Sequence, residues 1–133
     1  MIEKLSYADW NNIQNKADEV DVMLKSCDIV YKINNLYCAC ETTNECNNIL
    51  VFSNVRDIGN IKAMLVFVYI LGMYENIRCI TITSTVGRYN IFKKIFAKHG
   101  AFPNPKDDRD KFYFLLDEDC LNDVYEHIKD YEC

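Results

Sequence analysis

The sequence predicts a single domain of the α/β (α+β) class, residues 1–133, with a mixed and mostly antiparallel central sheet and helices on both of its faces. Three observations predict this fold. Apolar segments with strand or helix periodicity succeed one another as strand, helix, three strands, helix, strand, helix, strand and helix. The three consecutive strands are joined by short polar segments, which favours antiparallel pairing. The helix after them separates two strands, which favours a parallel crossover.

Composition supports one globular domain and excludes several classes of function. Of the residues, 50% are hydrophobic and 26% are charged, which excludes a disordered chain. The formal net charge of -5 argues against duplex DNA as a partner, because DNA binding needs a concentrated basic surface. We see no signal-peptide pattern, and the longest apolar run, residues 63–73, is too short to span a bilayer. We therefore predict a cytoplasmic protein with no nucleic-acid or membrane partner.

The seven cysteines predict mostly free thiols in a reducing compartment. Their number is odd and their spacing contains no CxxC pair. Cys38 and Cys40 are two residues apart in a predicted strand, so their side chains share one face. A structural zinc site would need two more ligands nearby, and we predict no metal site. Cys79 lies in another predicted strand, where we expect a packed thiol rather than a nucleophile.

The first half of the chain reads as a strand, a long helix and three strands. Residues 2–5 form the first strand, and Ser6 is a suitable N-cap for a helix over residues 7–25, with Asp9 adding negative charge to its first turn. Strands are predicted for residues 28–33, Leu36–Glu41 and 49–55. A tight hairpin at Asn34-Asn35 is expected to join the first two of these strands, because Asn tolerates positive φ.

The second half alternates helices with strands. Helices are predicted for residues 61–74 and 88–99, with a strand over residues 78–83 between them. The second helix should turn Ile91, Phe92, Ile95 and Phe96 inward and Lys93, Lys94 and Lys98 outward. After a polar loop at residues 103–110 come a strand over residues 111–116 and an extra C-terminal helix in residues 117–133. Asp117 or Asp119 can cap that helix, whose apolar residues are Leu121, Val124, Tyr125 and Ile128.

The helix over residues 61–74 is apolar all round, which predicts burial on both sides. If one face packs on the sheet, Val66, Ile70 and Met73 form an apolar strip on another face. Strips of this kind usually mark an interface. We therefore expect a homo-oligomer or a partner protein to bind there, or the chain's own C-terminal helix to cover the strip.

Residues 48–102 carry a resemblance to a known family. The segment Arg56-Asp57-Ile58-Gly59-Asn60-Ile61 follows a short strand and opens a helix, and Gly100-Ala101-Phe102 closes the next helix. This arrangement resembles the coenzyme A-binding half of the GCN5-related N-acetyltransferases (GNAT), whose motif is Arg/Gln-x-x-Gly-x-Gly/Ala. Ile61 replaces the last small residue of that motif. The start of the chain, a strand ending in Ser with Asp three residues later, is similar to the start of these enzymes.

The resemblance implies an acyl-coenzyme A-dependent N-acetyltransferase that uses acetyl-coenzyme A. A helix N-terminus with free N–H groups is a physically sensible site for a pyrophosphate. The implied cofactor contacts are the main chain of Val51 and Ser53 and the segment Arg56, Asp57, Ile58, Gly59, Asn60, Ile61 and Lys62. Glu41, at the end of the third strand, occupies a position that several members use for a general base.

Two departures from the family pattern keep a second function open. The family commonly has a tyrosine that protonates the leaving thiolate where this chain has Phe96, and Ile61 crowds the approach to the phosphates. The chain also resembles a small internal virion protein of short-tailed phages. The alternative is therefore a non-catalytic protein with a GNAT fold, such as a phage virion or accessory protein, located in the host cytoplasm or the virion.

Overall fold

The computed structural model describes residues 1–6, 8–9, 28–42, 48–52, 58–83, 90–99, 102–103 and 111–131. Its elements within these residues are β1 Ile2–Lys4, β2 Ile29–Ile33, β3 Leu36–Glu41, β4 Asn48–Phe52, α2 Ile58–Met73, β5 Cys79–Thr83, α4 Asn90–His99, β6 Phe102–Pro103, β7 Lys111–Leu115 and α5 Glu118–Ile128. The predicted order is confirmed in the described part of the chain, and only β6 was not predicted.

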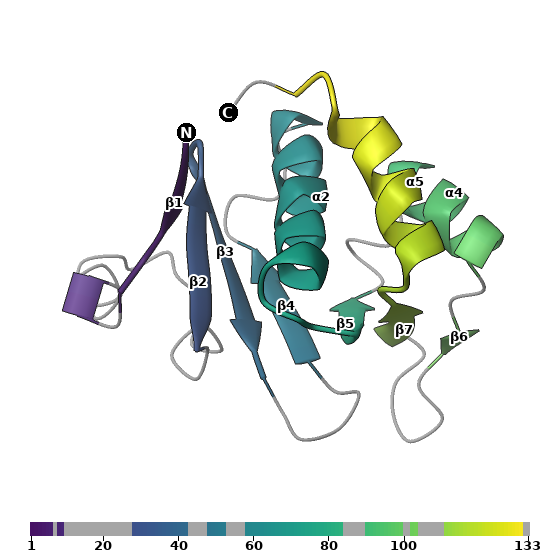
Figure 1. The fold of residues 1–133 in the computed structure, drawn as a ribbon, viewed down its shortest axis with the longest axis horizontal. Helices are drawn as coiled ribbons and strands as arrows, with labels where there is room; N and C mark the ends of the chain where they lie inside the picture. Colours follow the sequence, from purple (N-terminus) through teal and green to yellow (C-terminus); the bar gives the residue numbers. More distant parts are fainter. Residues whose placement is uncertain are drawn as a thin grey trace.

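One sheet contains all the described strands in the order β1-β2-β3-β4-β5-β7-β6 (Figure 1). Neighbouring strands are antiparallel except β4 and β5, which are parallel and are joined in the chain through α2. The fold is therefore of the α+β class with a mixed, mostly antiparallel sheet, as predicted.

The turn between β2 and β3 is a two-residue hairpin. Ile33 pairs with Leu36, which leaves Asn34 and Asn35 as the turn. Asn34 has a φ of 53°, in the left-handed region that asparagine tolerates better than most residues. The predicted hairpin is confirmed.

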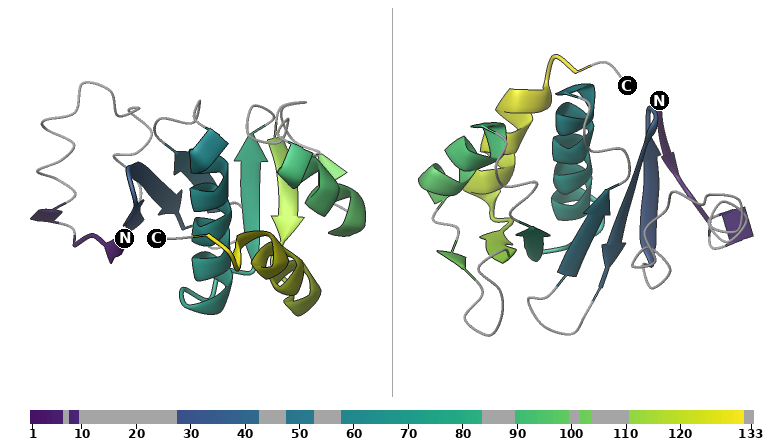
Figure 2. Two further views of the ribbon diagram at one scale, coloured as in Figure 1. Left: turned by 90° about the horizontal axis from the view of Figure 1, so that it is seen from above. Right: turned by 180° about the vertical axis from the view of Figure 1, so that it is seen from behind.

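The described helices lie together on one side of the curved sheet. α2 packs across β2 and β3, α5 packs along α2, and α4 contacts both α5 and β7. Figure 2 shows α2 and α5 side by side from two further directions. The sheet face under these helices holds the main core cluster.

The opposite face of the sheet is buried as well. Val30, Ala39, Cys79 and Thr81 are at most 5% exposed, but they alternate with residues of the core cluster and do not belong to it. The predicted helix over residues 7–25 lies almost entirely outside the described residues. Helices on both faces therefore remain a prediction.

The beginning of that helix is described, and its predicted cap is confirmed. The backbone N–H of Asp9 donates to Ser6 Oγ at 3.2 Å, and the Ser6 hydroxyl donates to the Asp9 carboxylate at 2.9 Å. The first hydrogen bond satisfies one of the N–H groups that a helix N-terminus leaves free.

Helix α2 is buried almost all round, as its composition predicted. Val66 and Ile70 are only 6% and 7% exposed, whereas Met73 at its end is 53% exposed. The prediction that Val66, Ile70 and Met73 form an exposed strip for a second copy or a partner is therefore wrong for the first two. The described chain covers this helix itself, which was the third possibility.

Helix α5 covers α2 in an antiparallel orientation. The rings of Tyr69 and Tyr125 lie 5.7 Å apart, and Lys62 Nζ donates to the backbone carbonyl of His127. Gly72 lies against Leu121. The N-cap of α5 is Asp117, whose carboxylate accepts from the N–H of Cys120 at 2.8 Å. Of the two predicted caps, the first is confirmed.

Helix α4 is amphipathic as predicted. Phe92 and Ile95 are fully buried and Ile91 is half-buried, while Lys94 and Lys98 are exposed. The side chains of Lys93 and Phe96, which were assigned to the outer and inner faces, lie outside the described part.

The loop predicted for residues 103–110 begins one residue too early. Pro103 pairs with Phe112 in the two-residue edge strand β6, and residues 104–110 lie outside the described residues. An edge strand can accommodate proline because one side of it needs no N–H donor.

Candidate functional site

The best candidate site lies where β4 and β5 part. These two parallel strands are paired only at Asn48 with Ile80 and at Ile49 with Thr81, although β4 continues to Phe52 and β5 to Thr83. Within these described strands, the ladder therefore ends before the strands do. Main-chain groups of β4 beyond Ile49 are not part of this ladder and are candidates for pairing with an extended ligand.

Helix α2 begins at Ile58, six residues after the end of β4. Its first turn carries backbone N–H groups without partners inside the helix and the positive end of the helix dipole. A strand that parts from its neighbour and then leads into a helix N-terminus can hold a ligand with an amide chain at one end and a phosphate at the other.

The structure places only some of the predicted cofactor residues. Val51 lies in β4 opposite Ala39 of β3. Ile58 and Gly59 form the start of α2, with only their backbones described. Ser53, Arg56 and Asp57 lie outside the described residues.

The first turns of α2 contain Asn60, Ile61 and Lys62. The surroundings of Ile61 and Lys62 differ from those predicted. Asn60 is half-buried. Ile61 is 8% exposed and belongs to the core cluster, so its side chain is directed into the core and does not crowd an open site. The Lys62 ammonium is bound to the C-terminal turn of α5. This contact stabilises the negative end of α5 and directs the charge of Lys62 away from a ligand.

Glu41 lies at the end of β3, opposite Ile49 of β4. Ile49 is also the last residue of β4 that pairs with β5. Glu41 is half-buried. Because it pairs with Ile49, it lies one strand away from the point where β4 and β5 part. This position is compatible with the predicted role of a base. Phe96 lies in α4, and its side chain is not described.

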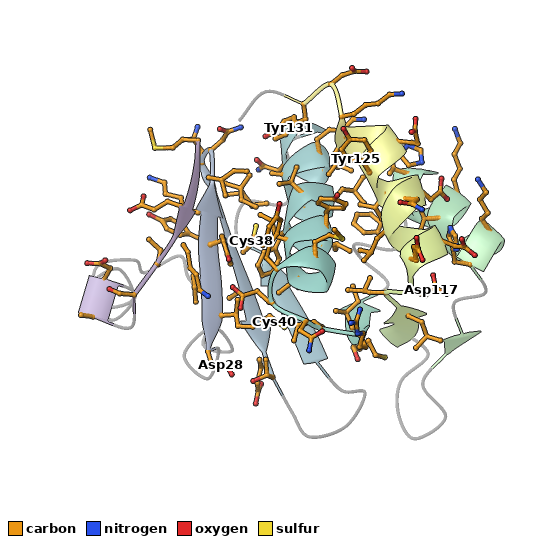
Figure 3. The ribbon with its side chains drawn as sticks, viewed as in Figure 1. Asp28, Cys38, Cys40, Asp117, Tyr125 and Tyr131 are labelled. Carbon is orange, nitrogen blue, oxygen red and sulfur yellow. The ribbon has the colours of Figure 1, made fainter. Side chains whose placement is uncertain are left out.

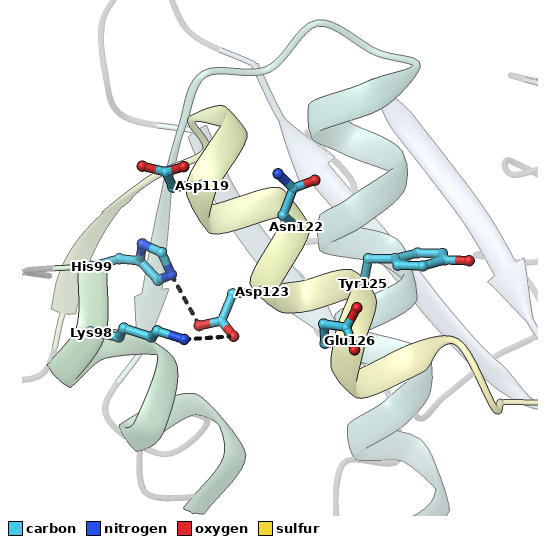
Figure 4. A pocket seen from close by; sticks show the side chains of 7 residues that line it. All are labelled: Lys98, His99, Asp119, Asn122, Asp123, Tyr125 and Glu126. Atoms are coloured by element: carbon cyan, nitrogen blue, oxygen red, sulfur yellow. Dashed lines mark hydrogen bonds and ion pairs between the residues drawn. The ribbon is translucent and has the colours of Figure 1, made fainter.

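A concave region lies between α4 and α5 and was not predicted from the sequence (Figure 4). It is a cavity of about 550 Å³. Its lining consists of Lys98, His99, Asp119, Asn122, Asp123, Tyr125 and Glu126. The only sequence signal was the spacing of polar residues on one face of α5.

Asp123 links the two helices across this cavity. His99 Nε2 lies 3.0 Å from one carboxylate oxygen of Asp123, and Lys98 Nζ lies 3.5 Å from the other. The His99 and Asp123 side chains are 12% and 15% exposed. The contacts of Asp123 with His99 and Lys98 join α5 to α4. The described residues contain no group of three or more potential metal ligands.

The described cysteines are buried. Cys38, Cys40 and Cys120 carry no disulfide, and the first two share the core face of β3 as predicted (Figure 3). Burial raises the pKa of Cys38 well above its usual range. Burial, followed by the charges of Asp117 and Asp123, raises the pKa of Cys120 to about 12. The Cys38 and Cys120 thiols therefore carry almost no thiolate at neutral pH and are poor nucleophiles.

Cys79 departs from the prediction of free thiols because it is disulfide-bonded. The other described cysteines carry no disulfide, so its partner lies outside the described residues. The expected packing of Cys79 is confirmed, since it is 5% exposed.

Comparison with known proteins gives no match. No family model matches the chain, and neither the curated proteins nor the solved structures include one that matches it. Among the described residues, no helix combines the length and the apolar character needed to cross a membrane.

Proposed function

We propose that this chain is a GNAT-like, acyl-coenzyme A-dependent N-acetyltransferase with an atypical and slow site. The observation that carries the proposal is the parting of β4 from β5 beside the N-terminus of α2. The chain topology supports it, because the resemblance implies three antiparallel strands, a crossover helix and a parallel step in this order.

In this proposal the cofactor is held largely by main-chain groups. The backbones of Val51 and Ser53 pair with the amides of the pantetheine arm. The N–H groups at the start of α2 bind the pyrophosphate, and Arg56 supplies the positive charge. Lys62 contributes no direct contact while its ammonium is bound to α5. Affinity should therefore depend strongly on Arg56.

The same proposal predicts slow chemistry. Glu41 is the candidate base for the acceptor amine. Phe96 cannot protonate the leaving thiolate, and a positioned acid typically contributes about 10²–10⁴-fold. Replacing Phe96 with Tyr should raise turnover if the rest of the site is competent.

The decisive experiment is calorimetric titration with acetyl-coenzyme A, together with a thermal-shift measurement. A ligand that binds only the folded state must raise the melting temperature. Arg56→Glu should abolish binding. Arg78→Glu is the matched control, because it makes the same charge change on an exposed residue before β5, at the opposite end from the parting. A wild type without measurable binding at millimolar acetyl-coenzyme A would refute the proposal.

The second candidate is a non-catalytic protein with the same fold, such as a phage virion or accessory protein. Two observations favour it. The phenylalanine at position 96 cannot act as an acid, and the Lys62 ammonium is bound to a backbone carbonyl of α5. The two candidates are distinguished by measuring thiol release from acetyl-coenzyme A in the presence of a panel of acceptors, small amines and lysine peptides. Release that increases in Phe96→Tyr supports the enzyme. No release by either protein supports the non-catalytic alternative.

A further inference from the structure

The end of strand β3 is tied to the start of β2 by an aspartate. Asp28 directly precedes β2 (Figure 3), and Glu41 is the last residue of β3. The backbone N–H of Asp28 donates to the carbonyl of Cys40 at 3.2 Å. One carboxylate oxygen of Asp28 accepts from the backbone N–H of Thr42 at 2.8 Å, and the other accepts from the Thr42 hydroxyl. Asp28 therefore binds the residue before Glu41 and the residue after it.

These contacts extend the pairing of β2 with β3, whose regular ladder stops short of Glu41. Within the described residues, the last pair of that ladder at this end is Ile29 with Cys40. On its other side Glu41 pairs with Ile49 of β4. The backbone at Glu41 is thus held from both sides, by the β4 ladder and by Asp28. A strand end without such contacts opens readily, because few hydrogen bonds must break.

The contacts of Asp28 act on the backbone torsions of Glu41. The Cys40 carbonyl belongs to the peptide unit before Glu41, and the Thr42 N–H belongs to the peptide unit after it. Each peptide unit is planar, so holding both units holds the φ and ψ angles between them. The direction of the Cα–Cβ bond follows from these angles, and it decides where the Glu41 side chain can reach. Hydrogen bonds to a charged carboxylate are also stronger than those between neutral groups.

We propose that Asp28 is a positioning residue for Glu41. The inference rests on the proposed function, in which the Glu41 carboxylate takes a proton from the acceptor amine. A general base must lie within hydrogen-bond reach of the proton that it takes, and a displacement of about 1 Å can cost a large part of its effect. In this role Asp28 touches neither the cofactor nor the acceptor. It acts through the two peptide units that flank Glu41.

The first test measures kcat/KM for an amine acceptor at saturating acetyl-coenzyme A. Asp28→Ala loses both side-chain hydrogen bonds, so kcat/KM should fall about tenfold, a part of the roughly 10²–10⁴-fold that a positioned base contributes. Asp28→Asn should restore most of this loss. Its amide oxygen can accept from the Thr42 N–H, and its NH₂ group can donate to the Thr42 hydroxyl oxygen. An Asn variant as impaired as the Ala variant would overturn the proposal.

Two further variants guard this test. Thr42→Val loses only the hydroxyl and keeps the backbone N–H, so it should show a smaller decrease than Asp28→Ala. It tests the same contact if Asp28→Ala does not fold. Asp130→Ala is the matched control, because it removes an exposed aspartate beyond the end of α5 and should leave kcat/KM unchanged.

A double-variant cycle separates positioning from a general structural effect. Glu41→Gln removes the base, so adding Asp28→Ala to it should cause no further loss of kcat/KM. A purely structural effect would lower kcat/KM by the same factor with and without Glu41, and that result would overturn the proposal. Hydrogen exchange of the Thr42 amide should be faster in Asp28→Ala than in the wild type, which checks the contact without any substrate.

Failure of this inference is distinguishable from failure of the proposed function. Calorimetry should give the same dissociation constant for acetyl-coenzyme A in the wild type and in Asp28→Ala, because the variant changes the base and not the cofactor contacts. A wild type that neither binds acetyl-coenzyme A nor releases its thiol refutes the proposed function, and the role of Asp28 with it. A wild type whose turnover equals that of Asp28→Ala refutes only the role of Asp28.

Discussion

Replacing Gly72 with Ala tests the packing of α5 on α2. A Cβ atom at position 72 would lie 2.5 Å and 2.7 Å from the two methyl carbons of Leu121 and 3.1 Å from its Cγ. Leu121 is only 5% exposed and is held in the core cluster. Contacts under 3.0 Å cannot persist, so either Leu121 leaves its rotamer or the two helices separate.

Two opposing effects set the magnitude of this change. Overpacking of a core contact costs about 1–3 kcal/mol. In the interior of a helix, alanine stabilises the folded state by up to about 1 kcal/mol relative to glycine. This stabilisation is smaller at position 72, because Gly72 directly precedes Met73, the last residue of α2. We therefore expect Gly72→Ala to lower the free energy of unfolding by about 1–2 kcal/mol.

Urea denaturation of four proteins measures the effect: wild type, Gly72→Ala, Leu121→Ala and the double variant. Leu121→Ala alone should cost about 2–4 kcal/mol, because it leaves a cavity. The double variant should be more stable than the sum of the single effects predicts, since the new methyl group enters that cavity. A Gly72→Ala protein as stable as the wild type, with strictly additive effects, would refute this account of the interface.

Other consequences of the structure are also measurable. Burial alone would raise the pKa of Glu75, but hydrogen bonds from Lys4 and Tyr31 and the charge of Lys4 outweigh it and hold this pKa below its usual 4.5. The resulting stability is present above that pH and lost as pH falls, so Glu75→Gln should cost about 1 kcal/mol at pH 7 and progressively less as the pH falls below 4.5 in urea titrations. Asp117→Ala should cost about 1 kcal/mol through loss of the α5 cap, and Asp117→Asn much less. Lys62→Met should lower the melting temperature by a few degrees in calorimetry, because a carbonyl at the end of α5 loses its donor.

The sequence predicted most of the described fold because its signals are local. The Asn34-Asn35 turn, the Ser6 and Asp117 caps and the amphipathic face of α4 each depend on a few neighbouring residues. The partner of α2 could not be predicted in the same way. Its apolar residues show that a cover is needed, but the choice between α5 and another chain depends on contacts more than forty residues away in sequence.

The candidate site was predictable only in part. The parallel step between β4 and β5 was predicted, because it follows from the order of strands and helices in the chain. The environments of Ile61 and Lys62 were not predictable, since each depends on how the core and α5 are placed around α2. The Asp123 link to His99 was missed for the same reason: it joins two helices that carry no local sign of each other.

The covering of α2 by α5 also has a consequence for synthesis on the ribosome. α2 ends at Met73, but α5 begins only at Glu118. At translation speeds of about 5–20 residues per second, the nascent chain presents the outer face of α2 for several seconds before α5 emerges. During that interval α2 can pack on β2 and β3, but α5 does not yet cover its apolar outer face, so we expect the nascent domain to bind a ribosome-associated chaperone.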